Sequence, residues 1–179
     1  MDASKQNDRG NHRVEVKRVS DRELVVTRRF NAPARLVFEA WTKPELFRQW
    51  WAPASVGMTF LACDMDARTG GTYRLEFGHP CSDQPAVFHG RYLEVTPPSK
   101  VVWTNEEGDG EGAITTVTFE EINGQTLVVM RDLHPSKEAL DEAIASGSTS
   151  CTEEQLGQLS DVLDASTASA HYGRQGSER

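Results

Sequence analysis

The sequence predicts an α+β fold in which a curved antiparallel sheet of about seven strands wraps around a long C-terminal helix, with two short helices between the first two strands. Three observations support this prediction. Two short amphipathic segments follow the first expected strand, apolar and polar residues alternate in segments between positions 58 and 132, and the hydrophobic period becomes helical in the last third. A curved sheet with one apolar face must be covered, and the C-terminal segment is the long amphipathic element available for this.

The composition is that of one acidic domain. The chain has 179 residues and a formal net charge of −8, which argues against binding to nucleic acids or to anionic membrane surfaces. Its three cysteines have no disulfide-framework spacing, which is typical of reduced thiols in a cytosol. No apolar run has the pattern of a signal peptide or a membrane span. We therefore expect a cytoplasmic protein, as a monomer or weak dimer.

Both ends of the chain are expected to be disordered. Residues 1–20 form a polar arm without hydrophobic periodicity, and residues 169–179 form a polar tail. The single domain should therefore occupy residues 21–168.

The domain is expected to begin with a strand followed by two short helices. Residues 23–30 alternate between two faces and are rich in β-branched side chains, which favours a strand. Residues 34–41 place four apolar side chains on one helical face. Thr42 and the glutamate three positions later have the spacing of a capping box, which predicts a second helix. Trp51, which follows that helix, is a candidate for the rim of a cavity.

Six further strands are expected between residues 58 and 132, in antiparallel order. The asparagine–glycine pair at 123–124 is a strong hairpin signal between the last two strands. Residues 87–96 carry apolar side chains at both parities, which either a β-bulge or two-sided burial would explain. The expected strands are residues 58–66, 72–77, 87–96, 100–105, 113–122 and 125–132.

The last third of the sequence predicts two helices. Ser136 can cap the first helix, and residues 146–150 interrupt the pattern before the second. Leu156, Leu159 and Leu163 form the apolar stripe of the final helix, which is expected over residues 153–165. At about 1.5 Å per residue this helix is long enough to cross a sheet.

A space between the sheet and the final helix is the main functional expectation. One helix cannot fill the concave face of a bent sheet, so the remaining space is expected either to hold bulky side chains or to form a cavity. Twelve residues of the strands, of the final helix and of the segment after the second short helix are the candidates for binding a ligand in this space. They are Trp51, Tyr73, Leu75, Phe77, His89, Trp103, Val117, Phe119, Arg131, Leu156, Leu159 and Leu163.

The sequence contains none of the common catalytic motifs. It lacks a phosphate-binding loop, a dinucleotide fingerprint, a zinc-protease motif and a nucleophile elbow, and its histidines lack metal-ligand spacing. Asp64 and Asp66 share one strand face, either as a general acid and base or as solvated side chains with an arginine partner. We expect no cofactor, no metal and no catalytic residue.

Four polar residues near the expected cavity allow alternative interpretations. Tyr73 can offer its hydroxyl to a ligand or to a backbone carbonyl, and His89 can approach the cavity or be a structural histidine. Arg131 and Asp132 point to opposite faces of the last strand, so only one of them can be inside. Arg131 is the candidate chosen for the inner position.

Three motifs are similar to those of a known family. The segments FNAPARLVFEAWTKPELFRQWW, DMDARTGGTYRLEF and HGRYLEVTPPSKVVWT resemble the AHSA-like family, homologues of an activator of a heat-shock chaperone ATPase. This family lies within the START-like or SRPBCC helix-grip superfamily. The similarity covers residues 23–165 and implies the helix-grip fold. The superfamily includes lipid carriers, hormone receptors, cyclases and co-chaperones, so the fold alone does not define the function.

Three functions are predicted, in order of preference. The first is the binding, without catalysis, of an apolar or amphipathic small molecule, lipid-like or aromatic, between sheet and helix. The second is a polyketide cyclase or dehydratase, in which His89, Tyr73 and Arg131 converge and move protons. The third is a co-chaperone-like module with a heat-shock chaperone as its partner and a role in a stress response.

Overall fold

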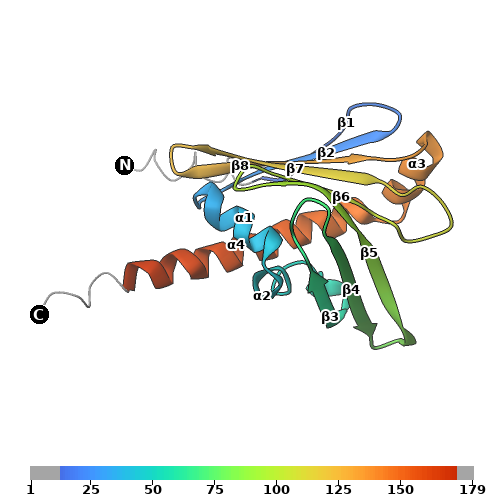
Figure 1. Ribbon diagram of the computed structural model, residues 1–179, viewed down its shortest axis with the longest axis horizontal. Helices are drawn as coiled ribbons and strands as arrows, with labels where there is room; N and C mark the ends of the chain where they lie inside the picture. Colours follow the sequence, from blue (N-terminus) through green and yellow to red (C-terminus); the bar gives the residue numbers. More distant parts are fainter. Residues whose placement is uncertain (1–12, 173–179) are drawn as a thin grey trace, which may run out of the picture.

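An eight-stranded antiparallel sheet curves over a long C-terminal helix in the computed structural model of the protein (Figure 1). The structure describes residues 13–172. The strand order is β1-β2-β8-β7-β6-β5-β4-β3. The strands are β1 (Glu15–Arg18), β2 (Glu23–Phe30), β3 (Thr59–Met65), β4 (Thr72–His79), β5 (Ser82–Thr96), β6 (Lys100–Thr104), β7 (Ile114–Ile122) and β8 (Gln125–Leu133). The helices are α1 (Ala34–Thr42), α2 (Pro44–Phe47), the 3₁₀ helix η1 (Ala54–Val56), α3 (Lys137–Ala145) and α4 (Ser148–Tyr172).

This architecture confirms the predicted fold class and adds one strand to it. The segment 15–18, expected to be part of a disordered arm, forms β1 and pairs antiparallel with β2 from Glu15↔Thr27 to Arg18↔Leu24. Four mostly exposed residues carry too little apolar pattern to show a strand, and the pairing arises from backbone hydrogen bonds to an open sheet edge. The earlier part of the expected arm, residues 1–12, lies outside the described residues.

The far end of the domain is also longer than expected. Helix α4 continues to Tyr172, past the predicted end at residue 165 and into the tail that was expected from residue 169. The remainder of that tail, residues 173–179, lies outside the described part of the chain.

The two short helices lie where the sequence places them, but the boundary between them differs. Helix α1 buries the predicted apolar face, which includes Val37 and Trp41. Thr42 is the last residue of α1 and its hydroxyl donates to the Phe38 carbonyl, so the predicted capping box is wrong. Lys43 is extended because a residue before proline avoids helical dihedrals, and this separates the two helices.

The long strand β5 joins two parts of the sheet that bend away from one another. Figure 1 shows β3, β4 and the first part of β5 descending from the layer formed by the other strands. Along β5 the pairing with β6 shifts between Tyr92↔Trp103 and Glu94↔Val102, so Leu93 is bulged. The bulge explains why Tyr92 and Val95, which differ in parity, both pair with buried residues of β6.

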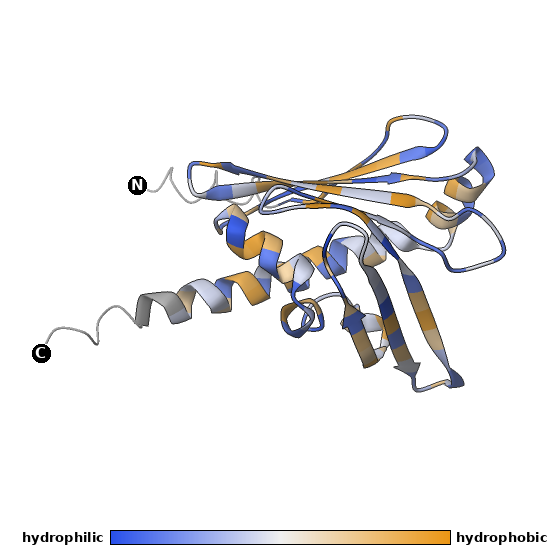
Figure 2. Cartoon of the chain, viewed as in Figure 1, coloured by the Kyte–Doolittle hydropathy of each residue, from blue (hydrophilic) through white to orange (hydrophobic). Residues whose placement is uncertain are grey.

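The hydrophobic core lies between the concave face of the sheet and helices α1 and α4. Leu159 is fully buried and Leu156 and Leu163 are nearly so, as the predicted apolar stripe requires. Trp50 is fully buried, and its indole N–H donates to the Ala40 carbonyl over 2.9 Å. In Figure 2 the apolar segments of α4 are interspersed with polar ones, as expected for a helix with one covered face.

Candidate functional site

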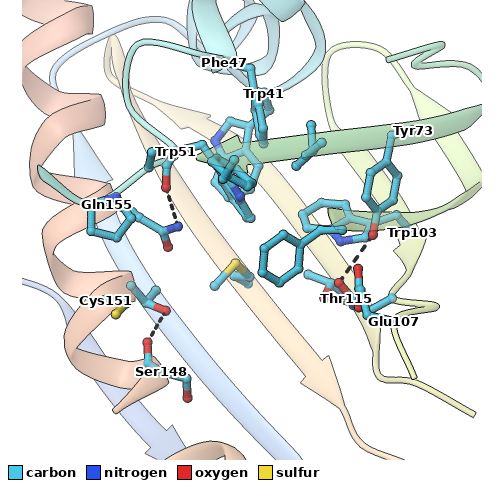
Figure 3. A pocket seen from close by; sticks show the side chains of 18 of the residues that line it. Trp41, Phe47, Trp51, Tyr73, Trp103, Glu107, Thr115, Ser148, Cys151 and Gln155 are labelled. Atoms are coloured by element: carbon cyan, nitrogen blue, oxygen red, sulfur yellow. Dashed lines mark hydrogen bonds between the residues drawn. The ribbon is translucent and has the colours of Figure 1, made fainter. Parts of the chain in front are cut away.

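A cavity of about 360 Å³ lies between the β3–β5 part of the sheet, the loop after α2 and the first turns of α4 (Figure 3). Its lining is mostly apolar, and the elements that form it are far apart in the sequence. Val56, Phe88 and Glu107 are the strongly exposed lining residues, and they mark the opening. The predicted space between sheet and helix is therefore a real hollow.

One wall of the cavity is formed by three tryptophans. The ring of Trp41, at the end of α1, lies 5.9 Å from the rings of Trp51 and Trp103, measured between centroids. Phe47 of α2 stacks on Trp51 at 4.7 Å. Ring pairs of this kind contribute about 0.5–1.5 kcal/mol each beyond burial, so the wall is well held. The buried indole N–H of Trp41, a residue that lines the cavity, has no hydrogen-bond partner within residues 13–172.

Strand β4 forms a second wall of the cavity, because its side chains alternate between the inner and the outer face of the sheet. Tyr73, Leu75 and Phe77 face inward and line the cavity. The register places Gly90 of β5 opposite Tyr73. A Cβ atom at position 90 would lie 2.9 Å from the Tyr73 ring and 2.0 Å from the carbonyl oxygen of Thr104. Glycine is therefore required here, because any side chain would collide with the Thr104 backbone and with the Tyr73 ring.

A chain of hydrogen bonds forms a polar end of the cavity. The Tyr73 hydroxyl donates to the Thr104 carbonyl over 2.7 Å and lies 3.5 Å from Oδ1 of Asn105. The Asn105 amide donates to the Thr115 hydroxyl over 3.1 Å, and that hydroxyl donates to Oδ1 of Asp132 over 2.6 Å. Figure 3 shows Tyr73, Thr115 and Glu107 together, across the cavity from α4. These side chains can recognise a polar group on an otherwise apolar ligand.

The electrostatic character of the polar end is acidic. Burial raises the pKa of Asp132 above its usual range, although the hydrogen bond from Thr115 and the proximity of His134 act in the opposite direction. Burial also raises the pKa of Tyr73, and the negative charge of Glu107 adds to that effect. Among the described residues that line the cavity there is no lysine, arginine or histidine.

The first turns of α4 form the wall opposite the polar end. Ser148, Cys151, Thr152 and Gln155 line the cavity from this helix. The Gln155 side-chain amide donates to the Trp51 carbonyl, as Figure 3 shows. One turn later, Gln158 donates to the carbonyls of the loop at positions 50 and 52, so this loop and α4 are joined by side-chain hydrogen bonds.

The cavity contains five of the twelve predicted ligand-binding residues. They are Trp51, Tyr73, Leu75, Phe77 and Trp103. The Tyr73 hydroxyl bonds a backbone carbonyl, which was one of its two predicted partners. Five other predicted residues are buried in the packed core between the sheet and helices α1 and α4, and they do not line the cavity. They are Val117, Phe119, Leu156, Leu159 and Leu163.

The expected inward orientation of His89 and Arg131 is contradicted by the structure. His89 is exposed because it pairs with Arg74 on the outer face, beside the inward pair Leu75↔Phe88. Arg131 is exposed and forms a 3.1 Å ion pair with Glu23. The three residues assigned to a cyclase mechanism therefore do not converge.

Asp132 occupies the inner position that the prediction gave to Arg131. It shares the parity of Met130, which is buried and lines the cavity, and it pairs with Thr115 across β7 and β8. The apolar residue Met130, two positions before Asp132, could have indicated from the sequence that Asp132 faces inward. Because Leu127 to Met130 are apolar at both parities, however, the sequence does not show which face of β8 is the inner one. Cys151 lies in α4 and lines the cavity, because that helix begins at Ser148, five residues before the predicted start at residue 153.

The structure also bears on the other sequence features considered as possible sites, a carboxylate pair and a metal centre. Asp66 forms an exposed ion pair with Arg68, and Asp64 is exposed, so this pair fits the solvated interpretation. No group of three potential metal ligands occurs within residues 13–172. None of the helices in that range combines the length and hydropathy needed to cross a bilayer.

Comparisons with known proteins agree with this architecture. The model of the family described as Activator of Hsp90 ATPase homolog 1-like protein matches residues 31–164. A search of curated proteins finds no match. Among solved structures, a protein from Rhodobacter sphaeroides is 23% identical, covering 86% of this chain and 99% of that one, with a TM-score of 0.78.

Two further solved structures extend the comparison. A protein from Staphylococcus epidermidis is 28% identical, covering 84% of this chain and 94% of that one, with a TM-score of 0.70. The AHSA1-like protein from Aeromonas hydrophila is 16% identical, covering 80% of this chain and 94% of that one, with a TM-score of 0.62. Where identity is this low the similarity establishes a shared fold.

Proposed function

The chain belongs to the family of Activator of Hsp90 ATPase homolog 1-like proteins, and from this premise we propose that it binds an apolar or amphipathic small molecule without transforming it. The binding site is the cavity between the sheet and α4, with the ligand held against the tryptophan wall. The proposed place of action is the cytoplasm.

The cavity itself is the observation that supports this proposal. Its volume of about 360 Å³ falls within the range of roughly 300–1,000 Å³ typical of small-molecule sites, and its lining is apolar with a few convergent polar groups. Protein interiors are normally packed without such spaces, and a hollow lined by apolar atoms reduces stability. A ligand that fills it recovers those contacts.

The arrangement of the polar groups favours binding over catalysis. Asn105, Thr115 and Asp132 bond to one another, and the Tyr73 hydroxyl donates to a backbone carbonyl. Groups engaged in this way fix an orientation and supply specificity, whereas acid–base catalysis needs a residue poised at the reacting atom.

A titration with the neutral apolar dye Nile red tests the proposal. We expect saturable binding with a rise in dye fluorescence, and displacement by uncharged aromatic compounds. Cys151→Phe would place a ring in the cavity and should weaken dye binding about tenfold or more, which corresponds to 1.4 kcal/mol. Ser150→Phe is the matched control, because this neighbour is exposed and does not line the cavity. Absence of dye binding to the wild type, or equal binding by both variants, would refute a ligand-binding cavity.

The family match supports a second candidate function, an interaction with a heat-shock chaperone. Such an interaction would use the outer surface and would be independent of the cavity. A pull-down with the purified chaperone, followed by an assay of its ATPase, tests this function. Cys151→Phe separates the two functions, because filling the cavity should weaken dye binding and leave a surface interaction unchanged.

A further inference from the structure

We propose that the ligand of this cavity carries a protonated amine on an apolar, ring-containing body, and that the amine pairs with the carboxylate of Asp132. This inference rests on the proposed function and specifies its ligand. It is carried by the sign of the charges that line the cavity, by the hydrogen bonds at its polar end and by the aromatic wall.

The charged groups of the cavity are all acidic. Asp132 and Glu107 line it, and the described lining contains no basic side chain. His134, which interacts electrostatically with Asp132 and favours its ionised form, does not line the cavity. Glu107 is exposed at the opening, whereas Asp132 lies deeper, at the end of the hydrogen-bonded chain. An approaching cation therefore meets one carboxylate at the entrance and a second one inside. Clefts lined by one sign of charge attract ligands of the opposite sign.

The bonding of Asp132 leaves room for one more donor. Thr115 is its hydrogen-bond donor within residues 13–172, and this bond uses Oδ1. A carboxylate can accept several hydrogen bonds, so Oδ2 is available to an N–H group of a ligand. A charge-assisted bond of this kind is shorter and stronger than a neutral one, and it is stronger still in a site with little water.

The aromatic wall suits the same ligand. Trp41, Trp51 and Trp103 form the wall that the ring-containing body of the ligand would contact, and aromatic rings pack favourably against one another in edge-to-face or offset arrangements. A carboxylate ligand such as a fatty acid would lack a basic partner and would be repelled by Asp132. A neutral alcohol would gain a hydrogen bond without the charge attraction. The order of affinity expected from these terms is amine, then alcohol, then carboxylate.

Three compounds that share one apolar body test this order. Phenylbutylamine, phenylbutanol and phenylbutyrate differ only in the terminal group, and each is titrated calorimetrically into the wild-type protein at neutral pH and moderate salt. We expect the amine to bind about tenfold or more tightly than phenylbutyrate, with phenylbutanol between them, because a hydrogen bond between two charged groups is stronger than one that involves a neutral hydroxyl. Equal or tighter binding of phenylbutyrate would overturn the inference.

Substitutions test whether the preference for the amine depends on the carboxylate of Asp132. Asp132→Asn should weaken phenylbutylamine about tenfold and change phenylbutanol by less than about twofold. Asp109→Asn removes one negative charge from the exposed loop outside the cavity, and should leave both affinities unchanged. Glu107→Gln, at the surface, should weaken only the amine and by a smaller factor. If Asp132→Asn binds the amine as well as the wild type does, the assigned partner is wrong.

The comparison among the three ligands requires no substitution, so it remains informative if a variant folds poorly. Failure of this inference is also separable from failure of the proposed function. If Nile red binds and the amine has no advantage over the carboxylate, the cavity binds ligands without the proposed charge selectivity. If neither the dye nor any of the three compounds binds, both proposals are refuted.

Discussion

The two parts of helix α4 perform different tasks on the same helical face. Ser148, Thr152 and Gln155 continue, at spacings of three and four residues, into Leu159 and Leu163. The leucines are buried in the core, whereas the earlier residues are small or polar and line the cavity. The hollow therefore results from a change of side chains along one helix.

This difference has an energetic consequence. The leucine part buries apolar surface and contributes stability, at about 25 cal/mol per Å². The polar part leaves space that a tightly packed helix would fill, which costs stability and provides a site. Natural proteins commonly show such a conflict between stability and function. Four substitutions, two in α4 and two in the opposite wall of the cavity, test how stability and ligand binding are divided between core and cavity. They are given from the largest expected effect to the smallest.

Leu159→Ala should produce the largest loss of stability. Leu159 is fully buried in the packed part of α4, and truncation of such a leucine costs about 2–5 kcal/mol. Thr152→Ala, on the same face but beside the cavity, should lower the free energy of unfolding by less than about 1 kcal/mol. Urea denaturation of both variants measures the contrast. Similar losses in the two variants would show that the two parts of the helix are packed alike.

Thr152→Leu should extend the leucine part into the cavity. The larger apolar side chain fills part of the hollow, and cavity-filling substitutions commonly add about 0.5–2 kcal/mol. Nile red should bind more weakly to this variant, because the same space is then occupied. Ser150→Leu, at an exposed position, is the control for helix propensity. Loss of stability together with unchanged dye binding would contradict the assignment of Thr152 to the cavity wall.

Tyr73→Phe should have a moderate effect. It removes the hydroxyl that donates to the Thr104 carbonyl over 2.7 Å, and a single hydrogen bond contributes about 0.5–1.5 kcal/mol to stability. The ring stays, so the apolar wall and Nile red binding should be retained. Thermal unfolding and the dye titration measure the two effects. A large loss of dye binding would instead assign the hydroxyl directly to the ligand.

Asp132→Asn should give the smallest stability effect, and its sign depends on pH. Because burial raises the pKa of Asp132, the folded protein holds its proton more tightly than the unfolded chain does. The contribution of this group to stability is therefore present at acidic pH, below the ordinary aspartate pKa of about 3.9, and is lost as pH rises through the raised value. The charged groups around it are His134, which favours the ionised form, and Glu107 in the same cavity.

The variant removes this ionisation and retains an acceptor for Thr115. Its melting temperature should exceed that of the wild type at neutral pH, by no more than the roughly 2–4 °C that corresponds to 1 kcal/mol in a chain of this size. The difference should disappear at acidic pH. Calorimetry at both pH values measures it, and a variant that is less stable at neutral pH would contradict the sign.

The alternation of apolar and polar residues in β4 allowed one wall of the cavity to be predicted. Apart from Tyr73, the residues of the polar end, including Asp132, were not predicted. In β4 the apolar residues occupy a single parity, so Tyr73 and Leu75 could be assigned to the inner face before the structure was known. In β8 both parities are apolar between positions 127 and 130, and β5 contains a bulge. The orientations of His89 and Arg131 could not be derived from such patterns, and both predictions were wrong.

By itself, the sequence determined the fold class, the order of the strands and helices from β2 onwards, and the apolar stripe with which α4 covers the sheet. Only the tertiary structure decided that Asp132 faces the cavity and that α4 begins early enough for Cys151 to line it. The physical reason is that the spacing of apolar residues divides a strand or helix into two faces. When both faces are apolar, as in β8, this spacing does not show which of them packs against the rest of the protein. The cavity exists because side chains from elements far apart in the chain do not fill the space between them. This can be seen only when those elements are packed together.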